Sequence, residues 1–226
     1  MTRSNLKNSV KRALHLLPAD VGRFLYRMRS EARGEKVHPA EKRNLLKNAM
    51  GKGEGMGRRL LTEGWRPGYP DYRDRDGWNE LLGTYRDEYI SRGERLLGYS
   101  WQLIKATDYL EYGRSGNQMA MERPFRQNIE SLTHLVMAEL AEGNGRFLNQ
   151  ITDGVFYLCE MTSWAFSAHL WMQKDNCFLP DHDENIIEMG TGKVASLLAW
   201  TYHFLKYELG GGNPLIANRI RREVEG

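Results

Sequence analysis

The side chains most capable of chemistry gather in one short stretch, CEMTSWAFSAHLW, at residues 159–171. On a continuous helix, which turns by about 100° per residue, Glu160 and Trp164 share one face. His169 lies nine residues after Glu160, so it points to nearly the opposite side of such a helix. The two could meet as an acid–base pair only if the helix ended near Ser167. The spacing supports no Ser–His or Cys–His dyad for nucleophilic catalysis.

Two interpretations of this stretch remain open. A sugar ring presents an apolar C–H face that stacks on an indole, and charged neighbours can hydrogen-bond to its hydroxyl and carboxylate groups. The same aromatic side chains are also typical anchors of a buried core helix. The carbohydrate interpretation requires that Trp164 and His169 are not both sealed in the packed interior.

Two further motifs are chemically suggestive but incomplete. The segment GTGKVAS at residues 190–196 is similar to a phosphate-binding loop, yet Ile187 stands where the pattern needs Gly and Val194 where it needs Ser or Thr. The start of a helix is the simpler interpretation.

The run DHDE at residues 181–184 has metal-capable side chains, but four consecutive loop residues rarely converge on one ion. We therefore expect no metal and no cofactor.

Helical periodicity dominates the chain. Apolar positions recur in steps of three and four after Pro124, which predicts a helix that Pro124 starts and Gly143 stops. Further helices are expected at 19–33, 39–49, 78–97, 100–113, 147–169 and 194–209, with a last one starting at Asn213-Pro214 and a loop at 64–78. No strand pattern appears, so we expect an all-α fold of antiparallel neighbours with no substantial β-sheet.

Composition limits the class of protein. The 226 residues suit one domain, and no apolar run approaches the roughly 20 residues of a membrane helix. The N-terminal sequence lacks the apolar length and cleavage site of a signal peptide. Two cysteines, Cys159 and Cys177, are too few for a disulfide framework or a four-cysteine zinc site. Whether they pair stays open, although two buried thiols are the favoured interpretation.

Charge is unevenly distributed. Residues 1–59 carry fifteen Lys and Arg against five Asp and Glu, a net +10, whereas residues 60–226 carry seventeen against twenty-four, a net −7. A basic segment can attract a polyanion, but a solvated helical face, or a surface that docks on the acidic remainder, is the favoured interpretation. Because no nucleic-acid-binding motif is present, nucleic acid is an unlikely partner.

Three phrases carry a family resemblance: YLEYGRSGN (109–117), ELAEGNGRFLNQITDGVFYLCEMTSWAFSAHLW (139–171) and PLIANRIRREVE (214–225). Together they resemble the N-terminal helical part of heparinase II/III-like polysaccharide lyases. The resemblance covers residues 60–226 and implies that they form part of an (α/α) toroid. Residues 1–59 add little to it and are expected, from their charge and periodicity, to be a separate basic helical segment. The resemblance also implies a periplasmic or extracellular location.

The activity that the resemblance implies is β-elimination on uronate-containing acidic glycans, with this chain forming one wall of the substrate cleft. The family's neutralising Asn and its Tyr and His, the usual base and acid, are expected in segments beyond Gly226. We therefore assign no catalytic residue here and expect this chain alone to be inactive. The alternative is a non-catalytic glycan-binding or scaffold module. An incomplete ring would expose apolar helix faces, so self-association is a further expectation.

Five residues match the family phrases and are carried over as candidate substrate-binding residues: Arg114, Asn117, Glu160, Trp164 and His169. Each also has a structural interpretation. Arg114 could cap its own helix, and Glu160 could be the buried partner of an arginine such as Arg146. The sequence departs from the family at residues 190–193, where an acidic and then small helix start is usual.

Overall fold

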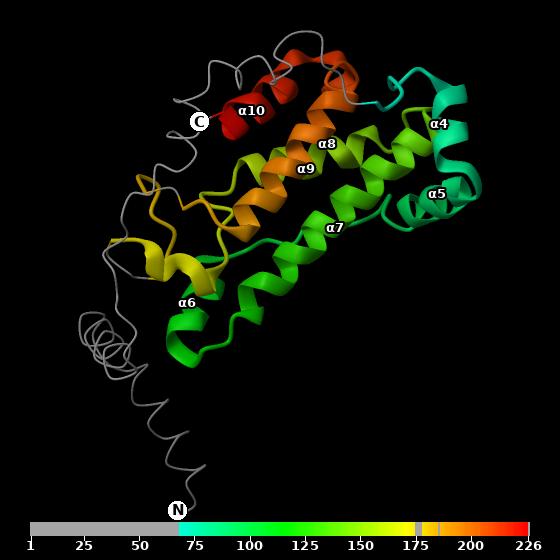
Figure 1. Cartoon of the computed structure of the whole chain (residues 1–226). Coiled ribbons are helices and arrows are strands. Elements are labelled where there is room, and N and C mark those ends of the chain that lie inside the picture. The colour runs from blue at the N-terminus through cyan, green and yellow to red at the C-terminus, as the bar shows by residue number, and fades with distance from the viewer. Residues whose placement is uncertain (1–67, 175–177, 185, 226) are drawn as a thin grey trace, which may run out of the picture. The chain divides into compact units, whose positions relative to one another are not determined.

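The computed structural model describes residues 68–174, 178–184 and 186–225, and all regular structure in these ranges is helical. The α-helices are α4 (Arg75–Leu82), α5 (Arg86–Glu94), α6 (Ala106–Ser115), α7 (Met119–Glu142), α8 (Leu148–Cys159), α9 (Met189–Leu205) and α10 (Pro214–Glu225), and the 3₁₀ helices are η1 (Gly83–Tyr85), η2 (Ser167–Met172) and η3 (Leu209–Gly212) (Figure 1). The expectation of an all-α fold is confirmed for these ranges. The helices expected at 19–33 and 39–49, and the whole basic segment 1–59, lie outside the described residues.

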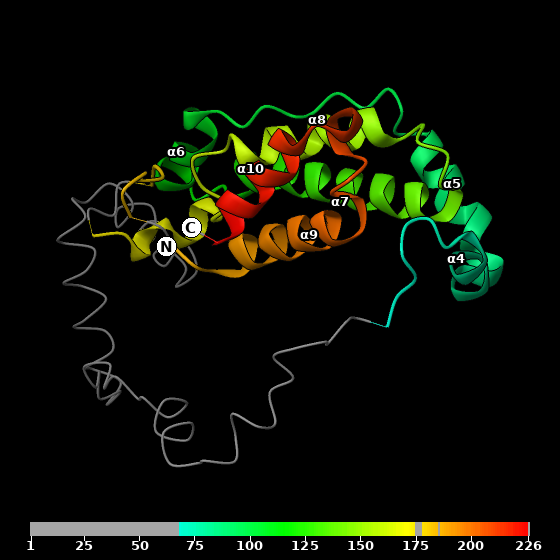
Figure 2. The same cartoon turned by 90° about the horizontal axis from the view of Figure 1, so that it is seen from above.

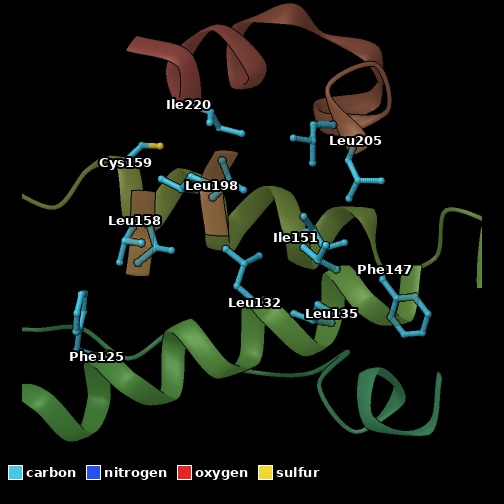
Figure 3. Close-up of a cluster of buried hydrophobic side chains, with 14 of the residues drawn as sticks. Phe125, Leu132, Leu135, Phe147, Ile151, Leu158, Cys159, Leu198, Leu205 and Ile220 are labelled. Atoms are coloured by element: carbon cyan, nitrogen blue, oxygen red, sulfur yellow. The ribbon is translucent and has the colours of Figure 1, made fainter. Parts of the chain in front are cut away.

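The central element is α7, which contacts α4, α5, α6, α8 and α9. Figure 2 shows α7 and α9 running side by side, and Figure 1 shows α10 beyond α8 and α9, on the side remote from α7. The core fills the space between these helices. Side chains from all four meet there in Figure 3: Leu132 and Leu135 from α7, Ile151 and Leu158 from α8, Leu198 and Leu205 from α9, and Ile220 from α10. Each such side chain, fully buried, contributes roughly 1.5–3 kcal/mol to the stability of the fold.

The start of α7 differs from the sequence prediction. The Asn117 side-chain oxygen accepts a hydrogen bond from the Met119 N–H at 3.1 Å and so satisfies one donor at the helix start. Pro124 consequently lies inside the helix and not in its first turn. Its ring nitrogen leaves the Ala120 carbonyl without the usual helical donor. The earlier start is still favourable because it brings Met121 into the core, where it is fully buried.

The end of α7 agrees with the prediction. Gly143 adopts the left-handed conformation with φ 70°, and its N–H donates to the Glu139 carbonyl at 2.7 Å. A short turn then leads into α8, which runs back in the opposite direction (Figure 3). The prediction that neighbouring helices are joined by short turns therefore holds at this junction.

The helix expected at 78–97 is two helices. Gly83 ends α4 with φ 50°, a conformation that glycine adopts without a side-chain clash, and η1 leads from there into α5. The loop expected at 64–78 ends early for a local reason. The Asp74 carboxylate accepts a hydrogen bond from the Gly77 N–H at 2.9 Å and so caps α4 at its N-terminus.

The helix expected at 100–113 begins only at Ala106. The chain before it is held by Asn128, a fully buried residue of α7. The Asn128 side chain accepts from the Gln102 N–H and donates to the Gln102 carbonyl, both at 2.9 Å. A side chain that occupies both backbone groups of one residue excludes that residue from a helix.

The largest difference concerns the segment from which the sequence analysis began. The helix expected at 147–169 ends at Cys159, so Glu160 and Trp164 do not share a helix face. The Trp164 indole N–H donates to the Leu158 carbonyl at 2.8 Å and satisfies one of the acceptors that a helix end leaves free. The chain that follows is non-helical until η2.

The last two helices lie where the sequence predicts helices, although α9 begins earlier than expected, at Met189. The helix expected at 194–209 is α9, which ends at Leu205, and Leu209 belongs to the separate η3. The Asn213 side chain accepts from the Leu215 N–H at 3.0 Å, so the expected cap of α10 is confirmed.

None of the helices in the described ranges is long and apolar enough to cross a membrane. The expectation of no membrane helix is thus consistent with this part of the chain.

Candidate functional site

The segment between α8 and η2 is held in place by helices on both sides. Trp164 is tied to the end of α8 by its indole N–H. The Tyr109 hydroxyl of α6 donates to the Ser163 carbonyl at 3.2 Å. Burial raises the pKa of Tyr109 well above its usual value, so this phenol stays a neutral donor. The segment is therefore fixed in position although it has no regular structure.

A buried carboxylate that the sequence analysis missed organises this region. Glu188 is the N-cap of α9, and its side chain is only 5 % exposed. Its Oε1 accepts from three backbone N–H groups, those of Gly190 at 2.6 Å, Thr191 at 3.1 Å and Phe166 at 3.3 Å. Its Oε2 lies 2.5 Å from His169 Nδ1. One side chain thus joins the start of α9 to η2.

Two rings of the η2 region and two charged groups of α7 pack beside this carboxylate. The Phe166 ring is buried and meets the His169 ring edge to face, with the centroids 5.9 Å apart. The Arg126 guanidinium lies over Phe166, 4.9 Å from its centroid, and forms an ion pair with Glu122 at 2.8 Å. Arg126 and Glu188 therefore contact the same two-ring unit.

Trp164 lines a pocket of about 330 Å³. The same pocket is lined by the hydroxyl-bearing Thr162 and Thr191 and by the neighbouring Arg222 and Glu223 of α10. An indole beside hydroxyl groups and a guanidinium suits a polar ring with an apolar face. Trp164 and His169 are both partly exposed, so the condition that the carbohydrate interpretation set for them is met.

Glu160 faces a different pocket, of about 470 Å³, together with Tyr109 and Tyr157. Its carboxylate forms an ion pair with Arg219 of α10. The expectation of a buried pair between Glu160 and Arg146 is wrong, because Glu160 is about half exposed and faces α10.

Arg146 pairs elsewhere, with Glu142 at 2.6 Å and with Glu94 at 2.7 Å. These carboxylates raise the pKa of the Arg146 guanidinium, which is always charged in any case. Arg146 therefore links α5, α7 and the start of α8 and takes no part in the pockets.

A third pocket, of about 590 Å³, lies between α8, η3 and α10. Its walls include Phe156, Asn218 and Arg219, and the Arg219 guanidinium lies 5.2 Å from the centroid of the Phe156 ring. This pocket shares Arg222 with the Trp164 pocket, and the Trp164 pocket shares Thr162 with the Glu160 pocket. The Trp164 pocket therefore adjoins each of the other two, and α10 lines the Trp164 pocket and the third pocket.

The other two candidate residues lie away from these pockets. Arg114 is exposed in the last turn of α6, which ends at Gly116 in the left-handed conformation. Asn117 is the side chain that starts α7. Neither residue lines any of the three pockets. The structure thus separates the five candidates: Glu160 and Trp164 face adjoining pockets, His169 joins Glu188, and Arg114 and Asn117 stand apart.

The two groups first considered for acid–base chemistry each have another partner. The break after Cys159 removes the helical argument against a meeting of Glu160 and His169. Even so, Glu160 pairs with Arg219, and His169 pairs with Glu188. The spacing of residues could not reveal Glu188, because it is the N-cap of α9 and lies nineteen residues after His169 in the sequence.

The described residues contain no cluster of three or more His, Cys, Asp or Glu side chains placed to hold a metal ion. Cys159 is a buried free thiol whose pKa is raised to about 12, first by burial. Cys177, the possible disulfide partner, lies outside the described residues.

No protein-family model matches the sequence, and no curated protein matches it significantly. The lyase resemblance therefore depends on the three sequence phrases alone.

Proposed function

We propose that this chain forms one wall of the substrate cleft of a polysaccharide lyase that cleaves uronate-containing acidic glycans by β-elimination. The resemblance of residues 60–226 to the helical part of heparinase II/III-like lyases supports the proposal. So does the succession from α7 to α10, in which consecutive α-helices reverse direction (Figure 1). In this proposal these helices are part of an (α/α) toroid, and the base and acid come from the segments that the resemblance places after Gly226.

The observation that carries the proposal is the shared pocket of Trp164 and Arg222. An indole offers a stacking surface for the C–H face of a pyranose ring. A guanidinium offers two parallel donors to the uronate carboxylate. In β-elimination the proton next to that carboxylate leaves readily only when the carboxylate charge is neutralised, so a cation in the cleft serves the chemistry as well as binding.

A non-catalytic glycan-binding module is the second candidate, and one observation favours it. Glu160 and His169 are the described groups of this segment best suited to proton transfer, and both have a partner: Glu160 pairs with Arg219, and His169 Nδ1 contacts Glu188. This chain then supplies recognition groups, and any elimination depends on other segments.

Binding is tested by titrating the purified chain with size-defined oligosaccharides from heparan sulfate, alginate and hyaluronan in a calorimeter. We expect Trp164→Ala to weaken binding about tenfold, equal to about 1.4 kcal/mol. Trp171→Ala is the matched control, because Trp171 is 59 % exposed and lines none of the three pockets. Binding should also weaken as salt rises, since Arg222 is exposed.

The outcomes separate the two candidates. Equal losses for Trp164→Ala and Trp171→Ala would mean that the Trp164 pocket is not the site. The elimination step is tested on the product of the complete natural gene, by the ultraviolet absorbance of unsaturated uronate ends. Saturable binding without any absorbance across the panel would leave the binding module and reject the lyase.

A further inference from the structure

The contact between Glu188 and His169 fixes which nitrogen of the imidazole carries a proton. Glu188 Oε1 already accepts three backbone N–H groups, an arrangement that suits an ionised carboxylate. An ionised carboxylate can only accept, so the His169 Nδ1 atom, 2.5 Å from Oε2, must be the donor. In the neutral ring, Nε2 is then the nitrogen without a proton.

The other side of the same ring reaches solvent. The His169 side chain is 32 % exposed, and its Nδ1 faces a carboxylate that is only 5 % exposed. Within the described part of the chain, the buried side-chain nitrogens without a partner are the Nε atoms of Arg86 and Arg219, so His169 Nε2 is not among them. The only hydrogen bond of the His169 ring in these residues is the one through Nδ1. The exposed edge is therefore the one that carries Nε2.

The same carboxylate also positions the wall of the Trp164 pocket. Glu188 Oε1 holds the N–H of Thr191, a residue that lines this pocket. It also holds the N–H of Phe166, two residues after Trp164. A side chain that fixes the imidazole, the pocket wall and the tryptophan segment together does more than start a helix.

We propose that Glu188 is a positioning residue that holds His169 with Nε2 directed outward, and that Nε2, once protonated, donates to the carboxylate of an acidic sugar. This inference rests on the proposed function and names a second recognition group for the same ligand. The charged groups that surround the ring are Glu188 on the α9 side, with Arg126 and its partner Glu122 on the α7 side behind Phe166. Because Nε2 can donate only when it carries a proton, we expect the affinity for uronate oligomers to be higher at pH 5.5 than at pH 8.

Two conservative substitutions test the positioning role separately from folding. In His169→Asn the side-chain amide can still donate to Glu188, but nothing replaces Nε2. We expect this variant to keep the wild-type unfolding midpoint and to lose about tenfold in affinity at pH 5.5.

In Glu188→Gln the amide oxygen can still accept the three backbone N–H groups. Its NH₂ group now faces Nδ1, so the imidazole proton must move to Nε2.

We therefore expect Glu188→Gln to move the proton of the neutral His169 ring, a change that loss of a merely structural contact would not produce. Nε2 becomes a donor in the neutral ring, so binding to uronate oligomers should lose most of its pH dependence. Nitrogen NMR of labelled histidine should show the neutral ring protonated at Nδ1 in the wild type and at Nε2 in the variant. This tautomer measurement needs no ligand.

The outcomes distinguish failure of this inference from failure of the proposed function. Wild-type binding that is equal at pH 5.5 and pH 8, or His169→Asn binding as tightly as wild type, overturns the inference and leaves the Trp164 site intact. A wild-type ring protonated at Nε2 overturns the positioning role whatever the ligand. If no acidic oligosaccharide binds the wild type, the ligand role of His169 falls together with the proposed function.

Discussion

Two buried carboxylates, Glu139 and Glu188, bind backbone N–H groups in different parts of the molecule. Glu139 belongs to the last turn of α7 and accepts N–H groups from the turn that leads into α8, whereas Glu188 is the N-cap of α9 and accepts N–H groups from the first turn of that helix and from Phe166. Glu139 takes the N–H groups of Gly145 at 2.9 Å and Phe147 at 3.1 Å and the Tyr72 hydroxyl at 2.6 Å. Glu188 takes three N–H groups and the His169 imidazole.

The two carboxylates differ in the side chain that donates to them and in whether that side chain reaches solvent. Glu139 is fully buried, and its side-chain donor is a phenol whose pKa is raised by burial and by Glu139 itself. Glu188 is completed by an imidazole whose far edge is exposed, beside a helix start that lines a pocket. A buried carboxylate is thus no sign of a functional site by itself. Such a carboxylate indicates a functional site only when the group that it orients reaches solvent.

The largest expected effect compares alanine substitutions at the two carboxylates. Glu139→Ala leaves the buried N–H of Phe147, the part-buried N–H of Gly145 and the Tyr72 phenol without an acceptor and should destabilise the fold by about 3–5 kcal/mol. Glu188→Ala should cost about 1–2 kcal/mol, close to the loss of an N-cap, because water can reach parts of its surroundings. Urea denaturation followed by circular dichroism measures both.

That pair of variants also tests the functional contrast. Glu188→Ala should weaken binding of acidic oligosaccharide at a temperature where it remains folded, since it frees His169. Equal losses of stability for the two variants would show that Glu188 is as purely structural as Glu139.

The next comparison uses the glycine that each carboxylate holds. Gly190 has an ordinary helical backbone, but a Cβ there would lie 2.4 Å from the Trp164 carbonyl oxygen. Gly190→Ala must therefore displace the Trp164 segment. Gly145 has φ 86° and open space around it, its nearest neighbour being Leu148 Cδ1 at 3.5 Å. Gly145→Ala should cost only backbone strain, about 1–2 kcal/mol.

For both glycine variants we would measure the unfolding midpoint and the tryptophan emission spectrum of the folded protein. We expect Gly190→Ala to shift the emission of the folded protein and to reduce glycan affinity, whereas Gly145→Ala should lower the unfolding midpoint without either change. An unchanged emission spectrum in Gly190→Ala would mean that the Trp164 segment does not depend on this close contact.

Local signals explain which parts of the fold the sequence could predict. The end of α7 at Gly143 and the cap of α10 at Asn213 each depend on one residue and its immediate neighbours, and both predictions are confirmed. The start of α7 is predicted wrongly because Pro124 is a strong local signal, yet the hydrogen bond from the Met119 N–H to the Asn117 side chain and the burial of Met121 outweigh it.

Non-local contacts explain what the sequence could not predict. The apolar pattern of α8 continues past Cys159, but the helix ends there, where Trp164 turns back onto the Leu158 carbonyl and Tyr109 of α6 holds the following chain. Glu188 was missed for the same reason. A glutamate before a glycine-rich helix start carries no sign that an imidazole nineteen residues earlier will meet it.

The smallest expected effect concerns Tyr72, whose hydroxyl donates to Glu139. The pKa of Tyr72 is raised by burial first and by its hydrogen bond to Glu139 second. Because the folded state holds this proton more tightly, the stability it contributes is fully present below the unfolded pKa of about 10 and is lost as pH rises above that value. Tyr72→Phe should therefore be less stable than wild type by about 1 kcal/mol at pH 7, and the gap should narrow above about pH 10. Urea denaturation at pH 7, 9 and 10.5 tests this, and a gap that stays constant would show that the folded state does not hold the Tyr72 proton more tightly than the unfolded chain does.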